Sequence, residues 1–174
     1  MNSILEHPGA RYVTPATPGR PHYAPAVDAI AQTLYRSPLM PWQLHTAQIE
    51  TEHEPGEGWA YRIIIVSVPR QAGKTTLRHP ISIHRCLIKP FARCWFTAQT
   101  REKARNLMVE EAGARFRRSP LRAFGKVRES QGSEGIYFKG TTESSYRIFP
   151  PTEGGLDSTT NDRVDFDESW KIAA

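Results

Sequence analysis

Residues 68–76 have the composition of a loop that binds phosphate, Val-Pro-Arg-Gln-Ala-Gly-Lys-Thr-Thr. Gly73 lets the backbone approach a phosphate closely, because glycine has no Cβ. Backbone N–H groups and the positive end of a following helix would surround the anion, Lys74 would reach the β- and γ-phosphates, and the Thr75 hydroxyl would ligate Mg²⁺. Val68 stands where the GxxxxGK[ST] pattern has its first glycine. The segment predicts a nucleotide site; the alternative is a helix N-terminus whose residues match by chance.

Two neighbouring carboxylates, Asp167 and Glu168, offer the second half of such a site. They close a short predicted strand at residues 163–167, and at the carboxyl edge of a parallel sheet they would lie beside the phosphate loop. One would hold Mg²⁺ through its water shell, and the other would orient and deprotonate the attacking water. Asp165 departs from the pattern, since an apolar residue is usual there. Alone, the cluster would be interpreted as solvated surface.

Two further polar residues fit a nucleotide site. Gln43 lies about thirty residues before the loop. Its amide could form two hydrogen bonds with an adenine edge, as protein glutamines do when they bind adenine in DNA. The alternative is an ordinary polar residue in the first turn of a helix. Arg70, inside the loop, could stabilise charge on the γ-phosphate. Otherwise it is a surface arginine.

The elements that must position these residues alternate between helices and strands. Apolar spacing and proline positions predict helices over residues 26–36, from Pro41, after Gly73 with Pro80 kinking or dividing it, and after a Thr100 cap. Apolar and β-branched runs predict strands at residues 63–68, 94–97, 136–138, 146–149 and 163–167, the third and fourth forming a hairpin. This alternation predicts an α/β domain with a mainly parallel sheet.

Composition narrows the class of protein. The chain has 174 residues, a net charge of +5 and no apolar run long enough for a membrane helix, and no apolar segment near Met1 suggests export. Residues 1–23, rich in proline, are expected to form an extended arm. Cys86 and Cys94 lack partners at zinc-ligand spacing and are expected to be small buried side chains. We therefore expect one cytosolic domain.

Positive charge gathers between Arg101 and Arg128. This stretch has nine basic residues against three acidic ones, a net of +6. Such a helix could neutralise the phosphates of nucleic acid. A solvated helix face is the alternative.

Taken in order, Pro-Trp-Gln at 41–43, the loop, Phe-Thr-Ala-Gln-Thr-Arg-Glu-Lys-Ala-Arg at 96–105 and Asp-Glu at 167–168 resemble the N-terminal ATPase domain of tailed-phage large terminase subunits. That family uses ATP to drive double-stranded DNA into a capsid. Its phosphate loop carries an arginine and tolerates loss of the first glycine, as Arg70 and Val68 do here. The resemblance runs from Pro41 to Glu168.

The resemblance implies a P-loop NTPase αβα sandwich with a mainly parallel sheet, incomplete at its C-terminal side. It divides the chain into an arm with a short helix (1–40) and an ATPase core (41–174). It also implies ATP and Mg²⁺ as cofactors, Thr75 and Asp167 as metal ligands, and Glu168, Arg70 and Lys74 as catalytic residues. The nucleotide would be bound by Gln43, Arg70, Gln71, Ala72, Gly73, Lys74, Thr75 and Thr76.

The implied partners are double-stranded DNA, a portal protein, a small terminase subunit and further copies in a ring, in the cytoplasm of a bacterial host. The family's coupling motif and nuclease cluster would follow Glu168, so slow hydrolysis and no DNA cleavage are expected of this chain. Three other classes stay open: another P-loop helicase or translocase, a nucleotide-binding assembly module without efficient turnover, and, least favoured, a small-molecule kinase.

Overall fold

The computed structural model describes residues 13–54, 56, 58–140, 142–152 and 160–167, which form two compact units. Of the described residues, the first unit comprises those between 13 and 32 and between 36 and 81, and the second comprises those between 33 and 35 and between 82 and 167. The boundaries after Gln32 and after Ile81 fall inside two helices. The predicted functional division into 1–40 and 41–174 is not tested by this grouping and stays a prediction.

Two helices of the first unit begin where proline permits. Helix α1 (Ala24–Tyr35) has a proline in its first turn, and α2 (Pro41–Glu50) starts on one, where the missing N–H would have no intrahelical acceptor. Arg36 ends α1 in the left-handed conformation, with φ of 57°. Both predicted helices are confirmed.

The predicted strand at residues 63–68 is wrong. In the described structure this segment belongs to no sheet, and Ile63 and Ile65 are 80% and 87% exposed. A β-branched run favours extended backbone, but a strand also needs a neighbour for its N–H and C=O groups. No described strand supplies that neighbour, so the local preference alone does not make a strand.

Helix α3 (Lys74–Ile88) begins immediately after Gly73, as the sequence predicts. Pro80 lies inside it without dividing it, although its ring nitrogen leaves the carbonyl of Thr76 without an intrahelical donor. Residues 74–81 of this helix belong to the first unit and residues 82–88 to the second.

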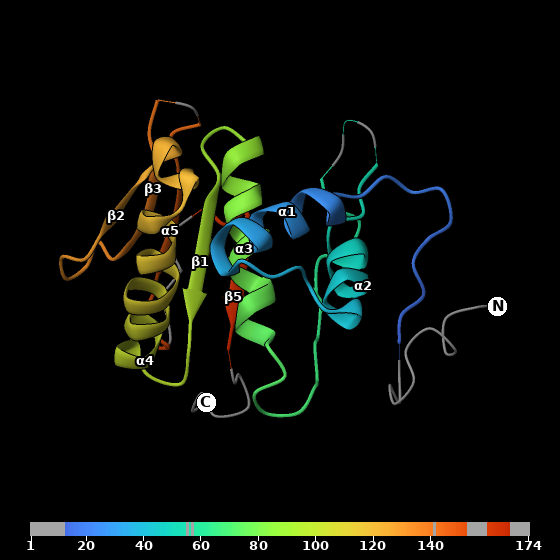
Figure 1. The fold of residues 1–174 in the computed structure, drawn as a ribbon, viewed down its shortest axis with the longest axis horizontal. Coiled ribbons are helices and arrows are strands. Elements are labelled where there is room, and N and C mark those ends of the chain that lie inside the picture. Colours follow the sequence, from blue (N-terminus) through green and yellow to red (C-terminus); the bar gives the residue numbers. More distant parts are fainter. Residues whose placement is uncertain (1–12, 55, 57, 141, 153–159, 168–174) are drawn as a thin grey trace. The chain divides into compact units, whose positions relative to one another are not determined.

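The second unit is built on a five-stranded sheet in the order β2-β3-β4-β1-β5 (Figure 1). Its helical segments are α4 (Arg101–Arg105), a π-helical stretch (Asn106–Gly113), α5 (Ala114–Arg118) and a 3₁₀ turn (Pro120–Phe124). The Thr100 hydroxyl caps α4 by accepting a hydrogen bond from the Lys103 N–H at 3.1 Å, as predicted. The strands are β1 (Arg93–Thr97), β2 (Lys126–Arg128), β3 (Gly135–Phe138), β4 (Ser144–Ile148) and β5 (Arg163–Phe166).

The sheet is mixed, which corrects the expected mainly parallel arrangement. Strand β1 runs parallel to both β4 and β5, whereas β3 is antiparallel to β2 and to β4. The predicted hairpin is therefore confirmed as β3–β4. Strand β2 was not predicted, because a single valine between two cations gives no apolar signal.

One face of the sheet carries the core of this unit. Figure 1 shows the α4–α5 segment along the sheet. Phe116 of α5 makes an edge-to-face contact with Phe138 of β3, their ring centroids 5.8 Å apart. Cys86 and Cys94 are buried, as predicted. None of the described helices is long and apolar enough to cross a bilayer.

Candidate nucleotide site

The loop before α3 has the backbone geometry that its glycine allows. Gly73 has φ of +89°, and Gln71 is also left-handed, with φ of 61°. The Ala72 N–H donates to the Pro69 carbonyl at 3.4 Å, and the Gly73 carbonyl accepts the first helical bond, from Leu77. Left-handed residues next to a helix N-terminus leave backbone N–H groups free to meet an anion.

The side chain of Lys74 reaches back across this loop. Its Nζ donates to the carbonyl of Val68 at 3.0 Å and to that of Pro69 at 3.4 Å. The Lys74 ammonium group thus binds the carbonyl of a residue six positions earlier in the chain. The cation lies over the loop, where a phosphate held by the loop would meet it.

The Gln43 side chain connects α2 to the loop by hydrogen bonds, and this residue is only 2% exposed. Its Nε2 donates to the Gly73 carbonyl at 2.8 Å, and its Oε1 accepts from the Met40 N–H at 2.8 Å. One amide hydrogen and one oxygen lone pair remain for any other partner. The adenine contact expected of Gln43 is untested, but the structure gives this residue a role in holding the loop.

The space around Gly73 leads to a prediction. A Cβ at Gly73 would lie 2.8 Å from Gln43 Nε2, and the positive φ strains any other residue. Replacement by alanine should displace Gln43 and weaken Mg-ATP binding by about tenfold or more in calorimetric titration. Gly19→Ala is the matched control, because Gly19 has φ of +76° with open space around it. Equal ATP affinities of the two variants would contradict this account of the loop.

The other predicted site residues divide between the two units. Arg70 and Gln71 are exposed, while Ala72, Thr75 and Thr76 are partly buried in the first unit. Asp167 is buried in the second unit. Glu168 lies outside the described residues. A shared site for the loop and the two carboxylates therefore stays a prediction.

Asp167 lies at the carboxyl edge of the three parallel strands. It follows β5 directly, and its N–H donates to the Thr97 carbonyl at the end of β1, at 2.9 Å. Thr97 Oγ1 in turn donates to the Phe149 carbonyl, just after β4, at 2.9 Å. This edge is where α/β proteins hold ligands, so the predicted placement of Asp167 at a strand end is confirmed.

Asp165, unexpected in a buried strand, is 4% exposed and fully paired. Arg163 binds it through two nitrogens, Nη2 at 2.6 Å and Nε at 3.0 Å, and the Ser82 hydroxyl of α3 donates to it at 2.6 Å. Burial raises the pKa of the adjoining Tyr146 well above its usual range, and the Asp165 charge raises it further. The cluster fastens β5 to α3 two residues before Asp167.

A second ionic contact holds the start of the same strand. Asp162 accepts from the Arg93 N–H at 2.9 Å, pairs with Lys89, and lies 3.8 Å from the Arg85 guanidinium. Arg85 lies in the last turn of α3, and Lys89 directly follows that helix, its N–H donating to the Arg85 carbonyl. Within the second unit, the end of α3 is therefore held against the start of the strand that leads to Asp167.

Comparisons with known proteins give one informative likeness. No family model matches the chain, and no curated protein matches it in sequence. The crystal structure of the HK97 bacteriophage large terminase matches with a TM-score of 0.61, over 84% of this chain and 37% of that one. The fold is terminase-like. At 13% identity the match shows the fold alone, and the chain spans little more than a third of the terminase that it matches.

The terminase-like fold also brings together residues that the sequence analysis did not single out. Arg93, Tyr137 and Arg147 come from three neighbouring strands of the mixed sheet. Tyr137 and Arg147 stand in predicted strands and Arg93 directly precedes one, and strand alternation places each side chain on one face of its own strand. This pattern could not be used without the order and register of the strands.

Proposed function

We propose that the chain is an ATP-binding and ATP-hydrolysing motor domain of the phage large terminase type, powering movement of double-stranded DNA into a capsid. The observation that carries the proposal is the loop of Gly73 and Lys74 at the start of α3 in a chain with a terminase-like fold. A P-loop NTPase architecture is part of the proposal.

The residues of the loop fit a nucleoside triphosphate with Mg²⁺. A Cβ at Gly73 would fill the cradle that Gln43 borders, and the Lys74 ammonium already lies over the loop carbonyls. We assign phosphate binding to the backbone from Gln71 to Thr76 and to Lys74, Mg²⁺ binding to Thr75 and Asp167, and adenine recognition to Gln43. ATP would supply the free energy for movement when it is hydrolysed.

We assign catalytic roles by the charge of each side chain and by its expected distance from the phosphates. Glu168 would accept a proton from water and Arg70 would neutralise charge at the γ-phosphate position. Lys74 would hold the β- and γ-phosphate positions. The exposed Arg70 side chain is free to turn toward an anion on the loop. Double-stranded DNA, a portal protein, a small terminase subunit and further copies of the chain are the proposed partners.

A second candidate function is nucleotide binding without efficient turnover, in an assembly module. The observation that favours it is the lack of a strand at residues 63–68, since the loop then lacks the buried strand that would hold its first residues rigid. This candidate shares the loop but does not require Glu168 as a base. A measured hydrolysis rate separates the two functions.

The test of nucleotide binding is the Lys74→Ala variant. Loss of a charge-assisted contact costs roughly 1.5–3 kcal/mol, so affinity for Mg-ATP should fall by about tenfold or more. Isothermal titration measures it, and Lys126→Ala, which removes an exposed cation from β2, is the matched control. Unchanged affinity in Lys74→Ala would refute the site.

A further inference from the structure

The sheet of the second unit has a second face, opposite to the one on which Phe116 of α5 packs. Strand register places Arg93, Ser145 and Tyr137 in one row across β1, β4 and β3. The next row contains Trp95, Arg147 and Arg128 on β1, β4 and β2. These side chains project opposite to Cys94, Tyr146 and Ile136, which lie on the helix-covered face.

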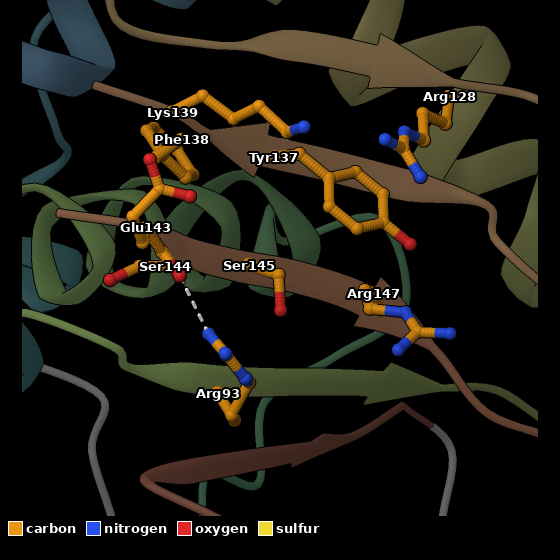
Figure 2. Close-up of a pocket in the computed structure, with 9 residues that line it drawn as sticks. All are labelled: Arg93, Arg128, Tyr137, Phe138, Lys139, Glu143, Ser144, Ser145 and Arg147. Carbon is orange, nitrogen blue, oxygen red and sulfur yellow. Dashed lines mark hydrogen bonds between the residues drawn. The ribbon is translucent and has the colours of Figure 1, made fainter. Parts of the chain in front are cut away.

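A hollow of about 280 Å³ opens on this face (Figure 2). Its lining contains four cations against a single carboxylate, and no aliphatic side chain. Figure 2 shows the Arg128 and Arg147 guanidinium groups near the Tyr137 ring, with Lys139 and Arg93 farther along the hollow. The lining residues are Arg93, Arg128, Tyr137, Phe138, Lys139, Glu143, Ser144, Ser145 and Arg147.

Within the described residues, the four cations of the hollow form no ion pair. Arg93 donates to the carbonyls of Ala92 and Glu143, and Arg147 donates to that of Gly132. Five other arginines of this unit, by contrast, form ion pairs. Carboxylates pair with Arg101, Arg105, Arg115, Arg117 and Arg163.

That contrast also bears on the basic segment 101–128, whose helical arginines are largely paired within the chain. Unneutralised positive charge gathers instead on the sheet face. A cluster of cations without counter-charges raises the local positive potential and attracts an anion from solution.

Two buried donors on this face lack acceptors. Trp95 is 7% exposed, and neither its Nε1–H nor the Nε–H of Arg147 has a hydrogen-bond partner among the described atoms. The Arg147 guanidinium lies 4.9 Å from the Trp95 ring centroid and 5.8 Å from that of Tyr137. The Arg128 guanidinium also lies over the Tyr137 ring, 4.4 Å from its centroid. Stacking holds these guanidinium groups in place before a ligand arrives.

We propose that this hollow, the basic sheet face, binds the phosphodiester backbone of nucleic acid. Three of its four cations are arginines, whose planar fork matches the oxygens of a phosphate. They are spread over β2, β4 and β1, a span of roughly 14 Å at about 4.8 Å per strand, which suits a chain of charges better than one small anion.

A protein partner is less well matched to the hollow. Apolar surface in this lining is confined to Tyr137 and Phe138, so a protein partner would have to bring several carboxylates to match the four cations. The inference uses none of the nucleotide-site residues. It therefore stands or falls separately from the proposed ATP binding.

The test is binding of short fluorescein-labelled duplex DNA, and of the matching single strand, followed by fluorescence anisotropy without nucleotide over a series of salt concentrations. Arg128→Gln/Arg147→Gln should weaken binding by about tenfold or more and reduce the slope of log affinity against log salt by about 1.8, the share of two phosphate contacts. Arg118→Gln/Arg122→Gln, which removes two exposed cations from α5 and the turn after it, is the matched control and should change neither quantity.

Arg128→Glu/Lys139→Glu guards against misfolding, because both side chains are exposed. It should abolish binding while leaving the circular dichroism spectrum unchanged. Equal losses in the hollow and control variants, or no DNA binding in low salt, would overturn the inference. The inference would also be overturned if neither form of DNA bound while polyglutamate bound saturably, because that result would point to an acidic protein as the partner. DNA binding that persists in Lys74→Ala supports the inference whatever becomes of ATP.

Discussion

Replacing Asp165 by alanine should destabilise the chain by about 3–5 kcal/mol, the usual cost of leaving one member of a buried ion pair without its partner. Arg163 would then keep a buried guanidinium, and the Ser82 hydroxyl would lose its acceptor. Urea unfolding followed by circular dichroism measures the loss. We expect a lower transition midpoint.

Two matched variants test whether the loss of stability comes from the buried, unpaired charge of Arg163. Glu110→Ala breaks the exposed pair with Arg105 and should cost no more than about 1 kcal/mol. Arg163→Met together with Asp165→Leu removes both buried charges, and replacements of this kind are often neutral or stabilising. The account fails if Asp165→Ala unfolds at the same urea concentration as Glu110→Ala.

Replacing Glu168 by glutamine should lower ATP hydrolysis by about 100-fold or more, the contribution of a positioned general base. Glutamine keeps the size of the side chain and removes its basicity, so ATP affinity should stay almost unchanged. A sensitive phosphate-release assay is needed, because we expect a slow wild-type rate. Calorimetric titration of the same variant reports binding separately.

The control for this prediction is Glu102→Gln, which neutralises an exposed carboxylate in the first turn of α4. It should hydrolyse ATP at the wild-type rate. A Glu168→Gln variant that is as fast as wild type would show that Glu168 is not the base, and the nucleotide-binding assembly module would become the better proposal.

The Asp165 cluster also changes how the carboxylates near the C-terminus are interpreted. Asp162 pairs with Arg85 of α3 and with Lys89, which directly follows that helix, and Asp165 pairs with Arg163 of β5. They hold strand and helix together. Asp167, one residue past β5, lies at the strand edge, and its proposed role in binding Mg²⁺ stays a prediction.

Local signals in the sequence predicted most helices and strands correctly. The start of α3 after Gly73, the Thr100 cap of α4 and the proline at the start of α2 each depend on backbone groups within a few residues. Capping, helix periodicity and φ restrictions act over that range. The loop of Gly73 and Lys74 was recognisable for the same reason.

Only the tertiary structure decided features that depend on distant partners. Residues 63–68 have the composition of a strand but find no neighbour, whereas Lys126–Arg128 has no apolar signal and becomes β2 because β3 pairs with it. Gln43 meets Gly73 thirty residues away, and Asp165 is tolerated in the core because Arg163 and Ser82 surround it. The basic sheet face likewise requires strand order and register, which bring Arg93, Arg128 and Arg147 onto one surface. Pairing and burial are set by the whole chain, so a residue type at one position cannot specify them.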